Sequence, residues 1–144
     1  SICKDMPNIQ TISVHCEKNY PFRKQVSDVD IPLPAKSDDR TYLMAVDKAL
    51  ESLLAFNPSI VIYQAGVDGL SADRLGKLDL TREGLDQRNK KVFDCVDTLN
   101  VPCLVLMGGG YAEPIDPTVQ CLSDLYIEAA KRHQQRQESH ASFS

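Results

Sequence analysis

The sequence predicts an α/β fold with a mostly parallel open sheet and helices on both faces. Continuous apolar and β-branched runs at 59–65 (SIVIYQA) and 101–107 (VPCLVLM) are typical of strands that are covered on both faces. Segments with helical spacing separate these runs, and parallel pairing needs such connections. With 144 residues, 42% of them hydrophobic and 25% charged, the chain fits one globular unit of this kind.

The first predicted element is a strand at 9–15, where apolar and polar residues alternate. The segment 26–34 is expected to be an edge strand or an extended stretch, because its two prolines cannot donate ladder hydrogen bonds. Ser37 and Asp38 are candidate N-caps of the first helix. That helix should end at Asn57, because the proline that follows disfavours helical backbone before it.

The second half of the chain repeats the alternation of strand and helix. A long loop at 66–80 follows the strand at 59–65, and Thr81 caps a helix that extends to Leu99. After the strand at 101–107, a third helix is expected over 118–132. Residues 1–132 are thus predicted to be the folded domain, and the polar residues 133–144 a disordered tail.

Composition argues against several classes of protein. The formal net charge is −4 and the one basic cluster is KRHQQR at 131–136, so neither nucleic acid nor a membrane surface is expected as a partner. The sequence has no apolar run of the ~18 residues that a membrane span needs and no signal-peptide pattern. Five widely spaced cysteines without a C-x-x-C pair argue against a structural zinc site and fit a reducing compartment, the nucleus or the cytoplasm.

An acidic residue, Asp68, follows the strand at 59–65 at the edge where open α/β sheets place their ligands. A carboxylate that leaves a buried strand needs a partner, which could be a metal ion, an arginine or backbone N–H groups. Aspartate is also a common cap of turns, and the residues alone leave these alternatives open. The same alternatives apply to Asp73.

The strand at 101–107 ends in GGGY, residues 108–111. Glycines at a strand end let the backbone approach a ligand closely, but no phosphate-binding motif accompanies them. The phenol of Tyr111 could donate a hydrogen bond to a developing negative charge, or Tyr111 could be a packing residue. We expect Asp68 and Tyr111 to leave neighbouring parallel strands at the same end and to point into a common pocket.

Taken together, AGVDG, ADRLGKL, LTREGLDQRNKKVF and GGGY resemble, in order and spacing, the C-terminal half of the zinc-dependent histone deacetylase family, which has the arginase/deacetylase fold. The resemblance covers about residues 2–127 and is closest to class IV or bacterial-type members. It implies hydrolysis of N-acetyl-lysine, in a histone or another protein, to lysine and acetate. It also implies that the chain is part of a larger three-layer domain.

The resemblance assigns roles to individual residues. Asp68 corresponds to a zinc ligand, and Tyr111 to the tyrosine that polarises the acetyl carbonyl and stabilises the oxyanion. Gly109 corresponds to a glycine that faces the acyl-lysine, and Leu75 to an apolar residue at the channel rim. Ser13 and Val14 correspond to the segment whose backbone or hydroxyl oxygens bind a monovalent cation, usually potassium.

The D-x-H and His-His segments of the family have no counterpart in this chain. It contains three histidines, at positions 15, 133 and 140, and none is in such a context. The chain, which begins at Ser1, therefore reads as a piece that starts just after the family's catalytic strand. Because one aspartate cannot hold a catalytic zinc ion, we expect the isolated chain to be inactive. We expect it to associate with the N-terminal half of such a domain or with itself.

Two other functions stay open. The missing ligands would also fit a non-catalytic, deacetylase-like interaction module. The glycines at 108–110 would fit a phosphate- or nucleotide-binding α/β domain, although no lysine or arginine is next to them in the sequence.

Overall fold

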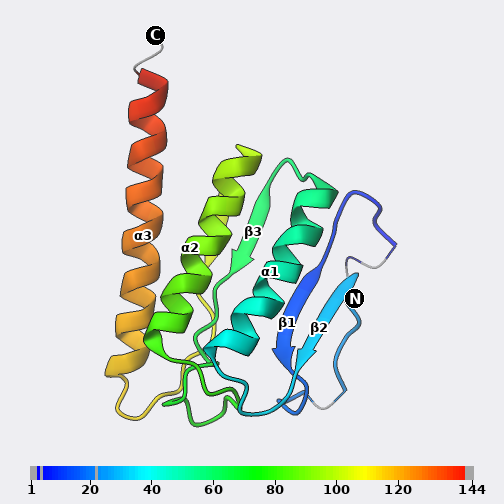
Figure 1. Ribbon diagram of the computed structural model, residues 1–144, viewed down its shortest axis with the longest axis vertical. Coiled ribbons are helices and arrows are strands. Elements are labelled where there is room, and N and C mark those ends of the chain that lie inside the picture. The colour runs from blue at the N-terminus through cyan, green and yellow to red at the C-terminus, as the bar shows by residue number, and fades with distance from the viewer. Residues whose placement is uncertain (1–2, 4, 22, 142–144) are drawn as a thin grey trace.

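A computed structural model describes residues 3, 5–21 and 23–141 of the chain (Figure 1). The elements are, in order, β1 (Ile12–Cys16), β2 (Val29–Leu33), α1 (Asp39–Phe56), β3 (Val61–Gln64), α2 (Arg82–Leu99), β4 (Cys103–Leu106) and α3 (Asp116–Ala141). This is the order predicted from the sequence, and the α/β fold class with parallel strands is confirmed. The expectation of one open sheet with helices on both faces is corrected among the described residues, where the strands form two pairs and the helices pack on one face of β3–β4.

The strands form two parallel pairs. In the first pair, β1 lies beside β2 with Val14 opposite Ile31. In the second pair, β3 lies beside β4 with Tyr63 opposite Val105. Because α2 connects β3 to β4, both strands run in the same direction and both end at the same edge of their pair.

The three helices cover one face of the β3–β4 pair. Val61 of β3 packs with Val92 of α2, and Ala65, just beyond β3, packs with Phe93 of α2 and Leu125 of α3. In Figure 1, α1, α2 and α3 lie side by side, and β3 is visible between α2 and α1. The hydrophobic core of this part of the molecule therefore lies between the helices and a single face of the strands.

The other face of β3–β4 is exposed. Alternate residues of a strand point to opposite faces, so Ile62, Leu104 and Leu106 point away from the helices. Their exposed fractions are 63%, 51% and 41%. Parallel sheets are normally covered on both faces, and no described residue of this chain covers this one.

The predicted helix ends are confirmed at their caps. The side chain of Asp38 accepts a hydrogen bond from the Thr41 amide at 2.9 Å, which caps α1. Asn57 ends α1 in the left-handed conformation, with a φ of 51°. The hydroxyl of Thr81 accepts from the Gly84 amide at 3.0 Å, which caps α2.

The C-terminal segment differs from the prediction. The sequence predicts disorder for residues 133–144, but α3 continues to Ala141, and residues 142–144 lie outside the described part of the chain. Ion pairs to α2 stabilise this extension: Arg132 Nη1 donates to Asp97 Oδ2 at 2.8 Å, and Arg136 Nε donates to Asp97 Oδ1 at 2.7 Å. Arg136 of the segment thus pairs with a neighbouring helix, a contact that sequence periodicity does not reveal.

Candidate active site

The candidate site lies where β3 and β4 end. Hydrogen bonds between the two segments continue past the strands, from the Ala65 amide to the Leu106 carbonyl at 3.0 Å and from the Val67 amide to the Gly108 carbonyl at 3.1 Å. Asp68 follows directly on this ladder. The prediction that Asp68 and Tyr111 leave neighbouring parallel strands at one edge is therefore confirmed.

Glycines surround the side chain of Asp68. A Cβ atom placed on Gly109 would lie 3.0 Å from the Cβ of Asp68 and 3.1 Å from its Oδ1. One placed on Gly66 would lie 3.1 Å from the same Oδ1. Gly109 also has a φ of +68°, a conformation that residues with a Cβ rarely adopt. The glycine-rich segment therefore lets the β4 backbone lie directly against the carboxylate.

Asp68 lines a cavity of about 550 Å³ that also includes Ser13, Val14, Gln64 and His15, and that we call the aspartate cavity. The residues predicted for a monovalent cation thus share a cavity with the predicted zinc ligand. The Ser13 hydroxyl and the Nδ1 atom of His15 are 2.8 Å apart. The polar groups of this cavity come from segments distant in sequence, among them β1, β3 and the loop that follows β3.

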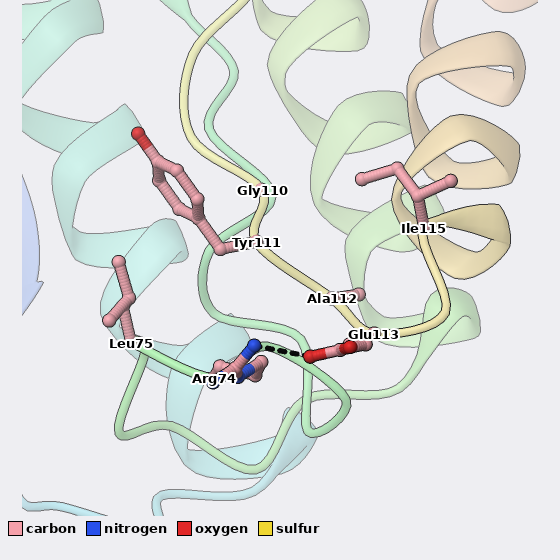
Figure 2. Close-up of a pocket in the computed structure, with 7 residues that line it drawn as sticks. All are labelled: Arg74, Leu75, Gly110, Tyr111, Ala112, Glu113 and Ile115. Atoms are coloured by element: carbon pink, nitrogen blue, oxygen red, sulfur yellow. Dashed lines mark hydrogen bonds and ion pairs between the residues drawn. The ribbon is translucent and has the colours of Figure 1, made fainter.

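Tyr111 lines a second cavity, of about 530 Å³, which we call the tyrosine cavity. Its lining is Arg74, Leu75, Gly110, Tyr111, Ala112, Glu113 and Ile115 (Figure 2). In Figure 2 the Leu75 and Tyr111 side chains extend to the same side, and Tyr111 is 60% exposed. Asp68 and Tyr111 line different cavities among the described residues, so the expectation of one common pocket is not met in this chain by itself.

The fold brings an arginine close to the glycine-rich segment, although none is adjacent in the sequence. Arg74 lines the tyrosine cavity with Gly110, and its backbone amide donates to the Tyr111 carbonyl at 3.3 Å. Its guanidinium forms an exposed ion pair with Glu113, drawn as a dashed line in Figure 2. This cation is thus already paired.

Two buried charged residues support the site, and neither role was identified from the sequence. Asp73 is 8% exposed, and its carboxylate accepts hydrogen bonds from the backbone amides of Leu75, Gly76 and Tyr111. The sequence indicates that Asp73 could cap a turn or bind a ligand. Its hydrogen bond from the Tyr111 amide, however, is a long-range contact. No local pattern encodes that contact.

Arg88 of α2 is the second buried charge, with 5% of its surface exposed. Its Nη1 donates to the Gly66 carbonyl at 2.6 Å, and its Nε and Nη2 donate to Asn89 Oδ1 at 3.1 and 2.9 Å. The Tyr63 hydroxyl donates to the same Asn89 oxygen at 2.8 Å, and burial raises the pKa of Tyr63 well above its ordinary value. Arg88 thereby connects α2 to the segment that ends in Asp68.

A sequence signal for Arg88 did exist. It lies three residues after Leu85 and four before Val92, which places a charged residue on the buried stripe of the second helix. A charge on such a stripe needs internal hydrogen-bond partners, because burial removes its water.

The residues of this chain do not by themselves fit a zinc site. Structural and catalytic zinc sites use at least three protein ligands from histidine, cysteine, aspartate and glutamate. No group of three such side chains comes together among residues 3, 5–21 and 23–141. Asp68 is thus a single potential ligand, and no chemical step can be assigned to a metal on this chain alone.

The family model of the histone deacetylase domain matches residues 1–123. The chain belongs to this family. An uncharacterized protein of Picosynechococcus sp. is 43% identical to this deacetylase-family chain over 119 residues, which are 82% of the chain and 40% of that protein. Histone deacetylase 2 of Arabidopsis thaliana is 32% identical over 111 residues, or 74% of the chain and 29% of that enzyme.

Solved structures show the same fold for this deacetylase-family chain. An acetylpolyamine aminohydrolase from Burkholderia pseudomallei superimposes with a TM-score of 0.62 at 20% identity, over 76% of this chain and 34% of that one. A homologue of histone deacetylases in complex with SAHA gives 0.55 at 24% identity, over 67% of this chain and 28% of that one. The chain thus spans 40% or less of these relatives, and its strands and helices match part of a larger domain. No helix in its described part is long and apolar enough to cross a membrane.

Proposed function

We propose that this chain contributes the Asp68 and Tyr111 segments to the active site of an amidohydrolase that converts N-acetyl-lysine in a protein substrate, such as a histone, to lysine and acetate. One observation carries the proposal: both segments leave neighbouring parallel strands at one edge, within the part of the chain that matches the histone deacetylase domain. Open α/β sheets bind their ligands at this edge.

Each proposed residue has a chemical task. The phenol of Tyr111 donates a hydrogen bond to the oxyanion that forms when water adds to the acetyl carbonyl. Gly109, which has no side chain, lets the backbone approach the apolar stem of a lysine, and Leu75 contacts that stem at the cavity rim. Asp68 would supply one carboxylate to a zinc ion, and the hydroxyl of Ser13 and the carbonyl of Val14 would bind a potassium ion.

The isolated chain is proposed to be inactive, because it lacks the other ligands of the metal and a histidine to accept the proton of the attacking water. We propose that a second polypeptide, which carries the D-x-H and His-His residues, covers the exposed face of β3–β4. The apolar residues on that face, Ile62, Leu104 and Leu106, would otherwise remain in contact with water.

The test combines the chain with the N-terminal part of its relative from Picosynechococcus sp., up to the point where the two sequences begin to match. We expect the mixture to form a complex by size-exclusion chromatography with light scattering, and to hydrolyse an acetyl-lysine peptide in the presence of zinc. The chain alone should give no turnover. Robust turnover by the chain alone would contradict the proposal, and so would a well-behaved monomer that does not bind the added partner. A dimer of the chain would indicate self-association.

The substitution Tyr111→Phe tests the role of the phenol in the complex. Removal of one oxyanion donor typically lowers the rate by ~10²–10³, and we expect a loss of that size with the complex intact. Tyr126→Phe is the matched control, because Tyr126 is a partly exposed tyrosine on α3 outside both cavities. Equal activities of the two variants would exclude the proposed role of Tyr111.

A non-catalytic interaction module is the second candidate. The absence of a three-ligand cluster among the described residues, together with the exposed apolar face, favours it. A complex that forms in the test above and binds zinc, but hydrolyses neither acetyl-lysine nor a longer acyl-lysine peptide, would support this candidate.

A further inference from the structure

The carboxylate of Asp73 is buried without a cationic partner among the residues that the structure describes. Its neighbour in sequence, Arg74, pairs with Glu113 instead. A buried charge of this kind must be stabilised by hydrogen bonds, since its hydration is lost. The donors that stabilise it therefore indicate what the residue does.

The donors come from two different loops. Oδ1 accepts from the amides of Leu75 and Gly76, each at 2.8 Å, within the loop that follows β3. Oδ2 accepts from the amide of Tyr111 at 2.5 Å, in the loop that follows β4. Each oxygen of the Asp73 carboxylate thus accepts hydrogen bonds from the backbone of one loop.

The backbone reinforces this arrangement. Asp73 forms an isolated antiparallel bridge with Ala112, and the Arg74 amide donates to the Tyr111 carbonyl at 3.3 Å. Leu75 and Tyr111, which line the tyrosine cavity together, are therefore connected through the residues at 73 and 74. The geometry of the cavity depends on this connection.

We propose that Asp73 is a positioning residue that holds Tyr111 at a fixed place relative to Leu75. This inference rests on the proposed function. In that function, Tyr111 is the oxyanion donor and Leu75 lies at the rim of the substrate site, and Asp73 keeps the distance between them fixed. Asp73 itself touches neither substrate nor metal in this scheme. It acts through the backbone of Tyr111.

The two-oxygen requirement provides a sharp test. Asparagine has nearly the same shape as aspartate, but only one of its two terminal atoms accepts hydrogen bonds. In the Asp73→Asn variant the amide oxygen should remain with the two donors of Leu75 and Gly76. Its NH₂ group would then face the Tyr111 amide, donor against donor, and the Tyr111 loop would be released.

The experiment measures amide hydrogen exchange by NMR on the full 144-residue chain. In Asp73→Asn we expect the Tyr111 amide to exchange roughly tenfold faster or more, as befits the loss of a hydrogen bond to a charged acceptor. The Val67 amide, which donates to the Gly108 carbonyl, should change less than about twofold and is the internal reference. Asp79→Asn is the control variant, since Asp79 is an exposed aspartate of the same loop and the acceptor of the Leu75, Gly76 and Tyr111 amides is Asp73.

A second variant, Asp73→Ala, removes both acceptors and should release the Leu75, Gly76 and Tyr111 amides together. A positioning role therefore predicts faster amide exchange in one loop for Asp73→Asn and in both loops for Asp73→Ala. Unchanged exchange at Tyr111 in both variants would overturn the proposal, and so would a uniform rise that includes Val67, which indicates only a less stable fold.

The complex described above separates this proposal from the proposed function. In the complex, Asp73→Asn should lower kcat for the acetyl-lysine peptide tenfold or more while KM changes less than threefold, because the donor is displaced and the stem contacts remain. If the exchange pattern appears but the wild-type complex has no deacetylase activity, the proposed function fails and the role of Asp73 in holding Tyr111 stands. An active complex in which kcat is unchanged would overturn the positioning role.

Discussion

The two cavities at the strand ends are supported in opposite ways. Behind the aspartate cavity, a cation in a helix, Arg88, donates to the Gly66 carbonyl and so holds the segment that leads to Asp68. Beside the tyrosine cavity, an anion in a loop, Asp73, accepts from the amides of two loops. Both charges are buried and neither has an ionic partner among the described residues. The Asp73 carboxylate is satisfied by backbone amides, whereas Arg88 donates to one backbone carbonyl and to the side chain of Asn89.

The difference between the two supports lies in what they connect. Arg88 is part of the core, so a change there alters the stability of the fold together with the position of Asp68. Asp73 connects loops outside the core, so a change there alters one cavity. The two halves of the candidate site should therefore respond separately to mutation, and the predictions below test that separation.

The largest effect is expected for Arg88→Met. The substitution keeps much of the side-chain volume but leaves the Gly66 carbonyl without its donor, and an unsatisfied buried acceptor costs about 1–3 kcal/mol. We expect the free energy of unfolding, from urea titration, to fall by that amount. Amide exchange should rise at Val67 and not at Tyr111, the reverse of Asp73→Asn.

Arg82→Met is the matched control for that prediction, because Arg82 lies on the same helix in an exposed ion pair with Asp124. Exposed pairs contribute under about 1 kcal/mol. If Arg88→Met were as stable as this control, or if it released Tyr111 as well, the two supports would not be independent.

A smaller effect is expected for Gly109→Ala. A φ of +68° disfavours alanine by about 1–2 kcal/mol, and the new Cβ would press against the Cβ of Asp68 at 3.0 Å. Gly66→Ala is the comparison, since its Cβ would lie 3.1 Å from Oδ1 of the same side chain and 3.4 Å from the Gly108 carbonyl oxygen, with an ordinary φ. In thermal unfolding, we expect a lower Tm for Gly109→Ala than for Gly66→Ala. The opposite order would show that backbone strain is not the main constraint at Gly109.

The smallest effect concerns a surface carboxylate, which contrasts with the buried Asp73. Hydrogen bonds from Arg82 hold the pKa of Asp124 below its ordinary value, so its contribution to stability is present above the unfolded-state pKa and is lost as the pH falls through the folded-state pKa. We expect Asp124→Asn to lose slightly less stability than wild type between neutral and acidic pH, by less than about 1 kcal/mol. Urea titrations at several pH values measure this, and a larger acid loss in the variant would contradict it.

Local sequence signals predicted the elements well, because their causes are local. The caps at Asp38 and Thr81 and the stop at Asn57 each depend on a few neighbouring residues. The prediction failed for residues 133–141, where the helix is stabilised by Asp97, a residue of another helix. A polar segment looks the same in sequence whether it is solvated or paired across a helix interface.

The site was predicted in part for the same reason. Placing Asp68 and Tyr111 at one sheet edge needed only the order of strands and the direction of a parallel pair. Their separation into two cavities, and the link from Asp73 to the Tyr111 amide, depend on contacts across 38 residues of chain. Such contacts leave no local pattern.

By itself, the sequence determined the strand and helix order, the family and the edge at which the candidate residues emerge, because hydrophobic periodicity, caps and motifs act over short distances. The tertiary structure alone decided which residues share a cavity and which buried charges hold them. It also decided which sheet face is left uncovered. These features depend on how distant segments pack and on which backbone groups remain to satisfy a charge that has lost its water.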